Sequence, residues 1–481
     1  MFPIQLMPDQ VEFVLLSFEG PDSYSKAGGL GVRVANLSHF LASQGFRTHL
    51  VFIGSPDLPG REALLDGQLQ YYRWCQWISR YHPLGVYDGE EGKLNDFNQS
   101  VPPFIIDQIA CPAISQGRHL VVLAEEWHTA EALIRLSDQL HEAGLRPYST
   151  LLWNANNTMG FERIDWPRLG YVATLTTVSR YMKQIMRGYG LDALIIPNGI
   201  PSDLVQPGVV AGARQVRARL AANGELLLFK VGRYDPAKCW WLAVEAAAQL
   251  KQEGRAVRFL CRGGIEPHGV EVLDHARALG LLVKDVGCRP QGWDEALDCI
   301  IAAGPADLYN LQFGMSQAML QVFYAASDFV LANSKHEPFG LVGLEAMAAG
   351  AVVFTGPTGE TYSADGAGAI ALDTDEPSEL VQAIETLSAH PERAQAIRRA
   401  APRVAARYTW DNVVEVLFEK IHLASSRQGV RPLHPTASQS QPLPDGLFPP
   451  CPPPPPALPL PAWPASPARR PVEIPLGAAA R

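Results

Sequence analysis

Three features that many proteins carry are missing from this chain of 481 residues. No apolar run reaches the ~18 residues that a membrane-spanning helix needs, so we expect no membrane span. The N-terminus lacks the basic stretch and the small-residue cleavage site of a secretion signal. The seven cysteines are dispersed and form no C-x-x-C pair, which argues against a disulfide framework or a zinc site. These features predict a cytoplasmic protein.

An excess of positive charge is also missing. The chain has 40 Lys and Arg against 49 Asp and Glu, and its net charge is −9. Because nucleic-acid binders usually carry a basic surface, we expect no nucleic-acid partner. What the chain does have is apolar sequence, since hydrophobic residues make up 47% of it. With domains of ~100–200 residues, two or three domains with sizeable cores are expected.

Short apolar runs alternate with helical patterns along most of the chain. The runs are apolar throughout, which is typical of parallel strands covered on both faces. Two series of them predict an α/β protein with two doubly wound domains, 1–205 and 206–427. The predicted strands are 11–18, 48–54, 119–125, 149–155 and 193–198 in the first domain, and 225–233, 257–263, 329–333 and 351–356 in the second.

Three segments stand apart from this alternation. Residues 55–118 are too many for a plain loop, so we expect helices and functional surface there. A final helix is predicted at 410–424, and the sequence leaves open whether it returns to the first domain. Residues 428–481 are dominated by proline, including Pro452–Pro456, and cannot bury enough apolar surface to fold. We expect a disordered tail there.

The segment after the predicted strand 329–333 indicates an anion site. Its loop, SKHEPFG, leads into the helical pattern LVGLEAMAAG. The backbone N–H groups of Phe339, Gly340 and Leu341 would then lie at a helix N-terminus, which binds anions readily. Glu337 and Glu345 flank that site, and carboxylates accept strong hydrogen bonds from sugar and ribose hydroxyls. A bare pair of acids could equally be an N-cap and a surface residue, but the whole string favours a nucleotide-sugar site.

Two cations follow the first predicted strand of the second domain. Asp235 is a good N-cap and Pro236 suits the first helical position, which predicts Lys238 in the first turn of a helix. A cation there is locally unfavourable, and a local rule that is broken hints at function. Arg233 and Lys238 together could neutralise a diphosphate leaving group. By themselves they could also be surface cations, one of them paired with Asp235.

A glycine-rich loop, SYSKAGGLG, follows the first strand of the first domain. Gly28 and Gly29 would let the backbone approach a ligand closely. This pattern alone is compatible with an ordinary strand-to-helix turn. Asp373-Thr374-Asp375 resembles a metal-binding D-x-D motif, but it precedes a helical pattern and is interpreted as a turn and helix cap. We therefore expect no metal and no cofactor.

Taken together, these motifs resemble those of the retaining glycosyltransferases of family 4, the group that includes glycogen and sucrose synthases. The resemblance rests on E-x7-E at Glu337 and Glu345, on R-x4-K at Arg233 and Lys238, and on the K-x-G-G-L loop. It implies the GT-B fold, in which two Rossmann-like domains face each other across a cleft. It also implies that Glu337 contacts the transferred sugar and Glu345 holds the ribose.

The resemblance also has implications for the first domain, and the chain departs from the family pattern at two positions. Lys26 would reach the donor phosphates, while Gly28 and Gly29 would line the sugar and acceptor side. Many relatives place a His near the transferred sugar, but here either Asn154 or Asn156 takes that position. The family also usually has Gly where this chain has Cys239. Asn can hydrogen-bond a sugar hydroxyl but cannot act as a general base.

The sequence therefore predicts a retaining glycosyltransferase. It would transfer a sugar from a nucleoside-diphosphate sugar to a hydroxyl of a glycan or small-molecule acceptor. Its leaving phosphate would take the acceptor proton after front-side attack, as the family resemblance suggests. Two alternatives stay open from the residues, namely a sugar-nucleotide epimerase of GT-B fold and a non-catalytic sugar-nucleotide-binding protein.

Overall fold

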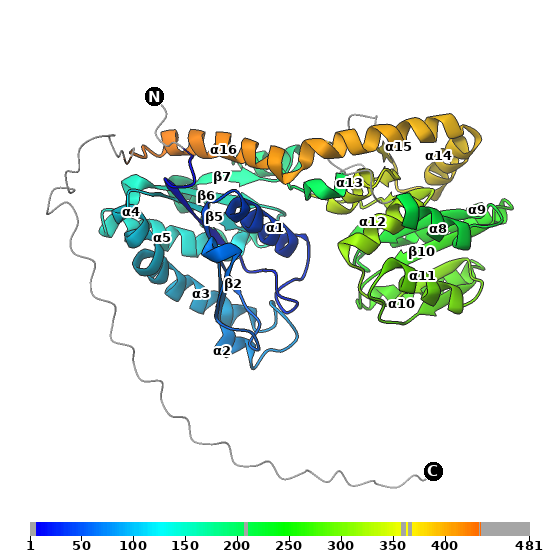
Figure 1. Cartoon of the computed structure of the whole chain (residues 1–481), viewed down its shortest axis with the longest axis horizontal. Helices are drawn as coiled ribbons and strands as arrows, with labels where there is room; N and C mark the ends of the chain where they lie inside the picture. The colour runs from blue at the N-terminus through cyan, green and yellow to red at the C-terminus, as the bar shows by residue number, and fades with distance from the viewer. Residues whose placement is uncertain (1–5, 206–209, 357–361, 364–367, 432, 434–481) are drawn as a thin grey trace, which may run out of the picture. The chain divides into compact units, whose positions relative to one another are not determined.

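Two parallel sheets organise the chain in the computed structural model (Figure 1). The structure describes residues 6–205, 210–356, 362–363, 368–431 and 433. The predicted pair of Rossmann-like α/β domains is confirmed, since each sheet is parallel, apart from one edge strand in the first, and has helices on both faces. Apart from residues 428–431 and 433, the predicted Pro-rich tail lies outside the described residues.

The first sheet has the strand order β3-β4-β2-β1-β5-β6-β7-β8. All neighbours pair in parallel except β3 and β4, which are antiparallel. The central strands are buried along their whole length, as their unbroken apolar runs predict. The strands are β1 (Val11–Leu16), β2 (Arg47–Ile53), β3 (Arg61–Leu64), β4 (Leu69–Trp74), β5 (His119–Glu125), β6 (Ser149–Ala155), β7 (Thr174–Thr177) and β8 (Leu194–Ile195).

Helices cover both faces of this sheet (Figure 1). Side chains of α1 and α16 share one apolar core with β1 and β2. On the other side α3 packs against α5. The helices are α1 (Gly29–Ser43), α2 (Gln76–Ser79), α3 (Glu90–Ile105), α4 (Cys111–Ser115), α5 (Ala130–Glu142), α6 (Trp166–Val172), α7 (Arg180–Gly188) and α16 (Trp410–Arg427).

The long segment 55–118 contains the predicted helices and also two strands that the sequence pattern did not reveal. β4 adds to the sheet beside β2, and β3 folds back on it as the edge strand. Both strands mix polar and apolar side chains: β3 alternates exposed and half-buried residues, whereas β4 is mostly buried but contains Gln70 and Arg73. An unbroken apolar run is the signal of a buried parallel strand, so an exposed edge strand and a strand interrupted by polar residues both escape it.

The second sheet has the strand order β11-β12-β10-β9-β13-β14-β15 and is parallel throughout. Helices α9, α10 and α14 share one apolar core with its strands. Helices α8, α11 and α12 pack against one another. The strands are β9 (Leu226–Val231), β10 (Val257–Arg262), β11 (Val283–Val286), β12 (Leu308–Leu311), β13 (Phe329–Ala332), β14 (Val352–Thr355) and β15 (Ile370–Ala371).

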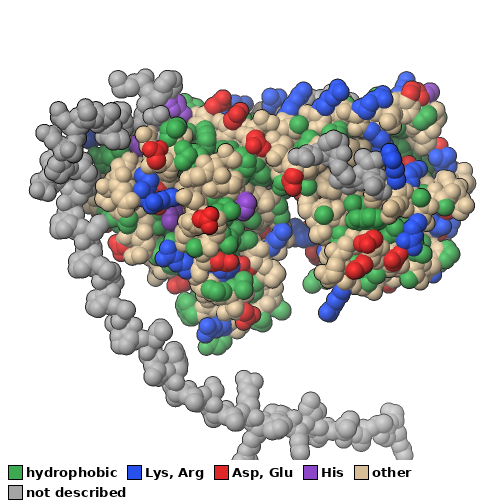
Figure 2. Space-filling model, viewed as in Figure 1, with side chains coloured by type: hydrophobic (Ala, Val, Ile, Leu, Met, Phe, Trp, Pro, Cys, Tyr) green, Lys and Arg blue, Asp and Glu red, His purple; other side chains and the backbone are tan. Residues whose placement is uncertain are grey.

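The helices of this domain follow the expected amphipathic pattern. In α15, Ala401, Val404 and Ala405 are buried, whereas Arg399 and Arg403 are exposed. Lys and Arg side chains are accordingly visible along this part of the surface (Figure 2). The helices are α8 (Val210–Leu220), α9 (Trp240–Gln252), α10 (His268–Ala278), α11 (Trp293–Ala302), α12 (Gln317–Ala326), α13 (Leu341–Ala348), α14 (Pro377–Ala389) and α15 (Pro391–Ala405).

The last helix, α16, belongs to the core of the first domain. Trp410 and Leu417 are buried in that core, and the hydroxyls of Thr150 and Ser425 hydrogen-bond at 2.8 Å. The chain stays attached beyond the expected boundary at 427, since the amide of Arg431 donates to the carbonyl of Pro147 at 2.7 Å. No helix among the described residues is long and apolar enough to cross a membrane.

The entry into α16 yields a stability prediction. A Cβ added to Gly199 would lie 2.5 Å from the ring of Trp410, and that ring is buried. We expect Gly199→Ala to lower the free energy of unfolding by about 1–3 kcal/mol, because overpacking forces the ring or backbone to shift. Gly188→Ala, at the end of α7 with nothing within 4 Å, is the matched control and should not destabilise the protein. Urea unfolding measures both, and equal midpoints would contradict the prediction.

Candidate active site

The predicted loop-to-helix turn is present at the start of α13. Gly340 is the N-cap and has a φ of 89°, a left-handed conformation that favours glycine. The hydroxyl of Tyr362 donates to the carbonyl of Gly340, and a Cβ at this position would lie 2.5 Å from that hydroxyl. The helix begins at Leu341, so of the three N–H groups predicted to bind an anion, that of Leu341 lies in the first turn, that of Gly340 at the cap and that of Phe339 just before it.

Glu337 and Lys238 meet in an ion pair that the sequence did not predict. Nζ of Lys238 lies 2.5 Å from Oε2 of Glu337, and both side chains are about a quarter exposed, at 26% and 22%. The two residues are far apart in the chain but come together because β9 and β13 are neighbours in the sheet. The site thus places a cation and a carboxylate side by side at the carboxyl edge of the sheet.

The turn from Arg233 to Lys238 is capped as expected, but it is short. The side chain of Asp235 accepts from the amide of Ala237 at 2.8 Å, but it caps only the short turn Pro236–Lys238. Cys239 then adopts φ 49° and ψ 50°, and α9 starts one residue later. Lys238 therefore lies in the first turn of a helix, as expected, but that helix is a single 3-10 turn and not the start of α9.

The helix is interrupted at Cys239, which has a left-handed backbone conformation. For a residue with a side chain this conformation costs about 1–2 kcal/mol of free energy, which is why glycine is common at such positions. The departure from the family pattern at this position therefore keeps the backbone conformation that glycine would adopt. Arg233 is exposed before the turn, and its carbonyl accepts from Nε1 of Trp240 at 2.7 Å.

Glu345 lies on α13 and is partly buried. Burial raises the pKa of its carboxyl to about 7, against the opposing effects of a hydrogen bond with Gln317 and the charge of Lys26. The loop that carries Lys26 thus comes near α13, and a Cβ on Gly29 would be 3.8 Å from Cδ1 of Leu341. The structure brings the glycine loop and the E-x7-E segment together.

The glycine loop is held by a residue that sequence reasoning missed. Oε2 of Glu19 accepts from the backbone N–H groups of Ala27, Gly28 and Gly31 at 3.2, 2.9 and 3.1 Å. An acid in the loop between the strand and the glycine-rich segment was the available signal, since a carboxylate suits the positive end of a helix. The N-terminus of α1 is thus occupied by this carboxylate.

The two asparagines considered for the missing His have different surroundings. Asn154 is buried, donates to Oε2 of Glu125 at 2.8 Å and accepts from the hydroxyl of Thr176 at 2.9 Å. Asn156 is less buried and also donates to Glu125, at 2.7 Å. Because both ends of the Asn154 amide have protein partners, Asn156 is the better placed of the two for a ligand.

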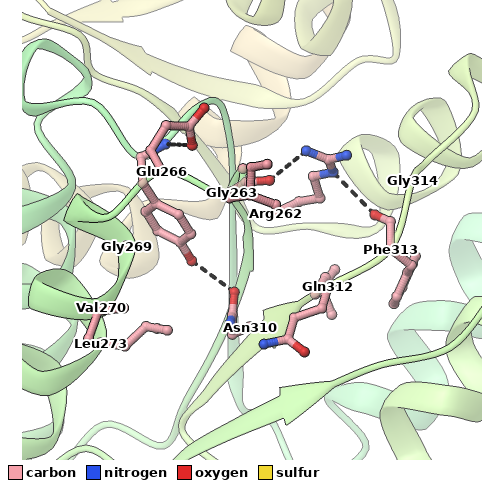
Figure 3. Close-up of a pocket in the computed structure, with 14 residues that line it drawn as sticks. Arg262, Gly263, Glu266, Gly269, Val270, Leu273, Asn310, Gln312, Phe313 and Gly314 are labelled. Atoms are coloured by element: carbon pink, nitrogen blue, oxygen red, sulfur yellow. Dashed lines mark hydrogen bonds between the residues drawn. The ribbon is translucent and has the colours of Figure 1, made fainter. Parts of the chain in front are cut away.

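A cavity of about 480 Å³ lies at the same sheet edge and was also missed. It is lined by the segments after β10 and β12 and by α10. Figure 3 shows Asn310 and Gln312 opposite Val270 and Leu273, so polar groups face an apolar wall. The glycine pair after β10, Gly263-Gly264, was the signal available in the sequence. The cavity has the size and mixed lining of a small-molecule site.

The D-x-D segment lies in a turn before α14. The carboxylate of Glu379 accepts from the amides of Asp373 and Thr374, both at 2.8 Å, and Asp375 pairs with Lys335. Within the part of the chain that the structure describes, no three His, Cys, Asp or Glu side chains gather to hold a metal ion.

The glycine loop yields a second stability prediction. A Cβ on Gly31 would lie 2.9 Å from the carbonyl of Gly20 and 3.2 Å from Oε2 of Glu19. We expect Gly31→Ala to lower the unfolding free energy by about 1–3 kcal/mol, since it displaces the carboxylate that caps α1. Gly29→Ala meets only an ordinary contact and should leave the midpoint of thermal unfolding within a degree or so of wild type. Equal losses in the two variants would contradict this account of the loop.

The carboxyl of Glu345 yields a prediction on pH. Its pKa of about 7 is above the ordinary value of 4.5, so the folded protein binds a proton that the unfolded chain releases. Stability should therefore fall as pH rises from about 4.5 through 7, by an amount on the order of 2 kcal/mol. Glu345→Gln should remove this part of the pH dependence in urea unfolding at pH 5 and pH 8. An unchanged difference between those two pH values would show that another group is responsible.

Comparison with known proteins agrees with this geometry. Residues 213–404 match the family model described as "Glycosyl transferases group 1". The chain is 24% identical to a D-inositol 3-phosphate glycosyltransferase of Thermobispora bispora over 82% of this chain and 89% of that protein. It is 28% identical to the enzyme of that name from Geodermatophilus obscurus, over 60% of this chain and 59% of that protein. The chain thus spans only about three fifths of the length of that second relative.

Solved structures share the architecture. Sucrose-phosphate synthase from Thermosynechococcus elongatus superposes with a TM-score of 0.62 and 19% identity, over 86% of this chain and 100% of that one. The catalytic domain of starch synthase IV from Arabidopsis thaliana, bound to ADP and acarbose, gives a TM-score of 0.62 and 14% identity, over 87% and 100%. Residues 213–404 are therefore similar to the glycosyl transferases group 1 family, and the two α/β domains of the chain have the GT-B architecture.

Proposed function

We propose that the protein transfers a sugar from a nucleoside-diphosphate sugar to a hydroxyl of an acceptor, with retention of the anomeric configuration. One observation carries the proposal. The Arg233–Lys238 turn, Glu337, the N-terminus of α13 and the cavity after β10 and β12 all follow strand ends at the carboxyl edge of one parallel sheet. That edge is where open α/β sheets bind their ligands.

The cavity supports a nucleoside at one end of this edge. Its wall of Val270 and Leu273 suits the faces of a base, while Asn310 and Gln312 offer amide groups to its edge. The carboxyl of Glu345 would hold the ribose hydroxyls. Lys26 and the N–H groups of Phe339, Gly340 and Leu341 would bind the phosphates.

The ion pair between Lys238 and Glu337 supports separate roles for these two residues, with the cation binding the diphosphate and the carboxylate binding the sugar. The charges of Lys238 and Glu337 neutralise each other at a distance of 2.5 Å. In the complex with the donor, the diphosphate would replace Glu337 as the partner of Lys238, and a sugar hydroxyl would replace Lys238 as the partner of Glu337. Arg233 and Lys238 would then stabilise the charge that develops on the leaving diphosphate.

The first domain supports the acceptor side. Glu19 binds the hydroxyl of Tyr87 at 2.7 Å, which brings the aromatic segment 76–87 against the glycine loop. Trp77 and Tyr81 in this segment are 63% and 81% exposed. Aromatic faces stack on sugars and carboxylates bind their hydroxyls, so a polyhydroxyl acceptor fits this surface. The acceptor proton would pass to the leaving phosphate.

We place the reaction in the cytoplasm, with no metal and no cofactor besides the donor. The described cysteines are free thiols, which suits a reducing compartment.

A nucleotide screen tests the proposal first. We expect UDP, ADP or GDP to raise the unfolding temperature, because a ligand at 100 times its Kd stabilises the folded state by about 2.7 kcal/mol. The matching nucleotide sugars should release nucleoside diphosphate when acceptors are added, from phosphorylated cyclitols to neutral oligosaccharides. Nuclear magnetic resonance of the product reports the anomeric configuration. Absence of stabilisation by all three diphosphates would refute donor binding.

Two variants then separate binding from transfer. We expect Lys238→Met to weaken nucleoside-diphosphate binding and to lower kcat by about 10²–10³, as the loss of a charge-stabilising group does elsewhere. Glu337→Gln should keep nucleoside-diphosphate affinity and lose sugar transfer. Lys251→Met, on the far end of α9, is the matched lysine control and should retain both. Transfer at the wild-type rate by Glu337→Gln would exclude the role proposed for this acid.

A further inference from the structure

Lys230 is a buried cation that the proposed reaction does not use. It lies on β9, and its side chain is only 2% exposed. Its Nζ donates to Oδ1 of Asn333 at 2.6 Å and to the carbonyl of Leu331 at 3.2 Å, and it lies 5.2 Å from the ring centre of Trp240. A lysine in an apolar core is unfavourable unless its contacts serve a purpose.

Both side chains that Lys230 contacts hold the turn from Arg233 to Cys239. Nδ2 of Asn333 donates to the carbonyl of Cys239 at 3.3 Å, at the end of the turn. Nε1 of Trp240 donates to the carbonyl of Arg233 at 2.7 Å, at its beginning. Lys230 therefore supports both ends of the turn that presents the basic pair.

The turn needs such support because its backbone is disfavoured. Cys239 has a left-handed conformation and lacks the freedom of glycine. One further bond, from the amide of Lys335 to the carbonyl of Ala237 at 2.9 Å, fixes the middle of the turn. The ends depend on Asn333 and Trp240, and both of these rest on Lys230.

The charge of Lys230 is also poised to respond to an anion. Burial lowers the pKa of its ammonium group to about 7. The titratable groups around it are Lys238 and Cys239 in the turn, Cys261 on β10 and Glu337 after β13. An anion bound at the turn would add negative charge nearby, and this favours the protonated form.

We propose that Lys230 is a positioning residue for the Arg233–Lys238 pair, which it holds through Asn333 and Trp240, and that it takes up a proton when a diphosphate binds at the turn. The inference rests on the proposed donor site and names a residue outside the E-x7-E and R-x4-K motifs. It also gives a physical reason why a cysteine is tolerated after Lys238. Trp240 and Asn333 have the same positioning role, because each hydrogen-bonds one end of the turn.

Lys230→Met tests the positioning role. Methionine has a similar length and no charge, and apolar replacements of buried charges are often tolerated by the fold. With UDP or ADP, whichever wild type binds more tightly, we expect Kd to rise at least tenfold and kcat/KM for the donor sugar to fall at least tenfold. The KM for the acceptor should not change. Ile384→Val, in the same apolar core on α14, is the control for a general loss of packing and should keep wild-type Kd.

Proton uptake tests the charge, which a merely structural role would not affect. Titration calorimetry of the same diphosphate at pH 7.5, in buffers of different ionisation enthalpy, gives the number of protons taken up. Wild type should take up about half a proton more than Lys230→Met, because a group with a pKa near 7 is mostly neutral at that pH. The comparison with the variant removes the contribution of the phosphate itself.

Asn333→Ala, alone and combined with Lys230→Met, tests whether Lys230 acts on the turn through Asn333. If Lys230 acts partly through Asn333, the two losses of affinity should be less than multiplicative. Should Lys230→Met fail to fold, Asn333→Ala alone must still weaken diphosphate binding severalfold. Wild-type affinity and unchanged proton uptake in the lysine variant, or wild-type affinity in Asn333→Ala, would overturn the inference while leaving the proposed function intact. If wild type binds no diphosphate, the proposed function fails and the inference falls with it.

Discussion

The pairing of β9 with β13 is the constraint on which the candidate site depends. These strands are neighbours in a parallel sheet, so the loops that follow them leave the same edge side by side. One loop carries the basic pair and the other carries Glu337, and the two meet in the ion pair of Lys238 with Glu337. Without that register, the two motifs would be separate surface features of the chain.

The two helix N-termini near the site show how one physical device serves two purposes. At α1 the first N–H groups are taken by the carboxylate of Glu19, which fixes the glycine loop. At α13 the cap is Gly340, whose left-handed backbone opens the turn without placing a side chain over it. Because Glu19 already accepts from its N–H groups, the N-terminus of α1 has a structural role. The bare glycine cap leaves the second terminus suited to a ligand's phosphate.

Burial shifts the charge state of two ionisable groups at the candidate site. Glu345 and Lys230 both lie where water is scarce, and burial shifts their pKa values toward neutrality from opposite directions. Groups of this kind respond strongly to the charge of a ligand, because a low dielectric strengthens every interaction among them. In the proposed complex the ribose of the donor would contact Glu345, whereas the charge of the diphosphate would act on Lys230 from the turn that Lys230 supports.

The sequence by itself determined the two α/β domains, because buried parallel strands must be apolar along their length. It also determined the E-x7-E turn, since Pro338 disfavours helix at the preceding residue and Gly340 permits the left-handed cap at which the helix starts. It did not reveal β3, β4, β11 or β12, whose side chains are partly solvated or whose runs are too short to stand out. Only the tertiary structure decided that Glu19 caps the glycine loop, that Lys238 pairs with Glu337 and that Lys230 supports their turn. Each of these contacts joins residues from separate elements, and its geometry follows from strand order and burial, which no local pattern contains.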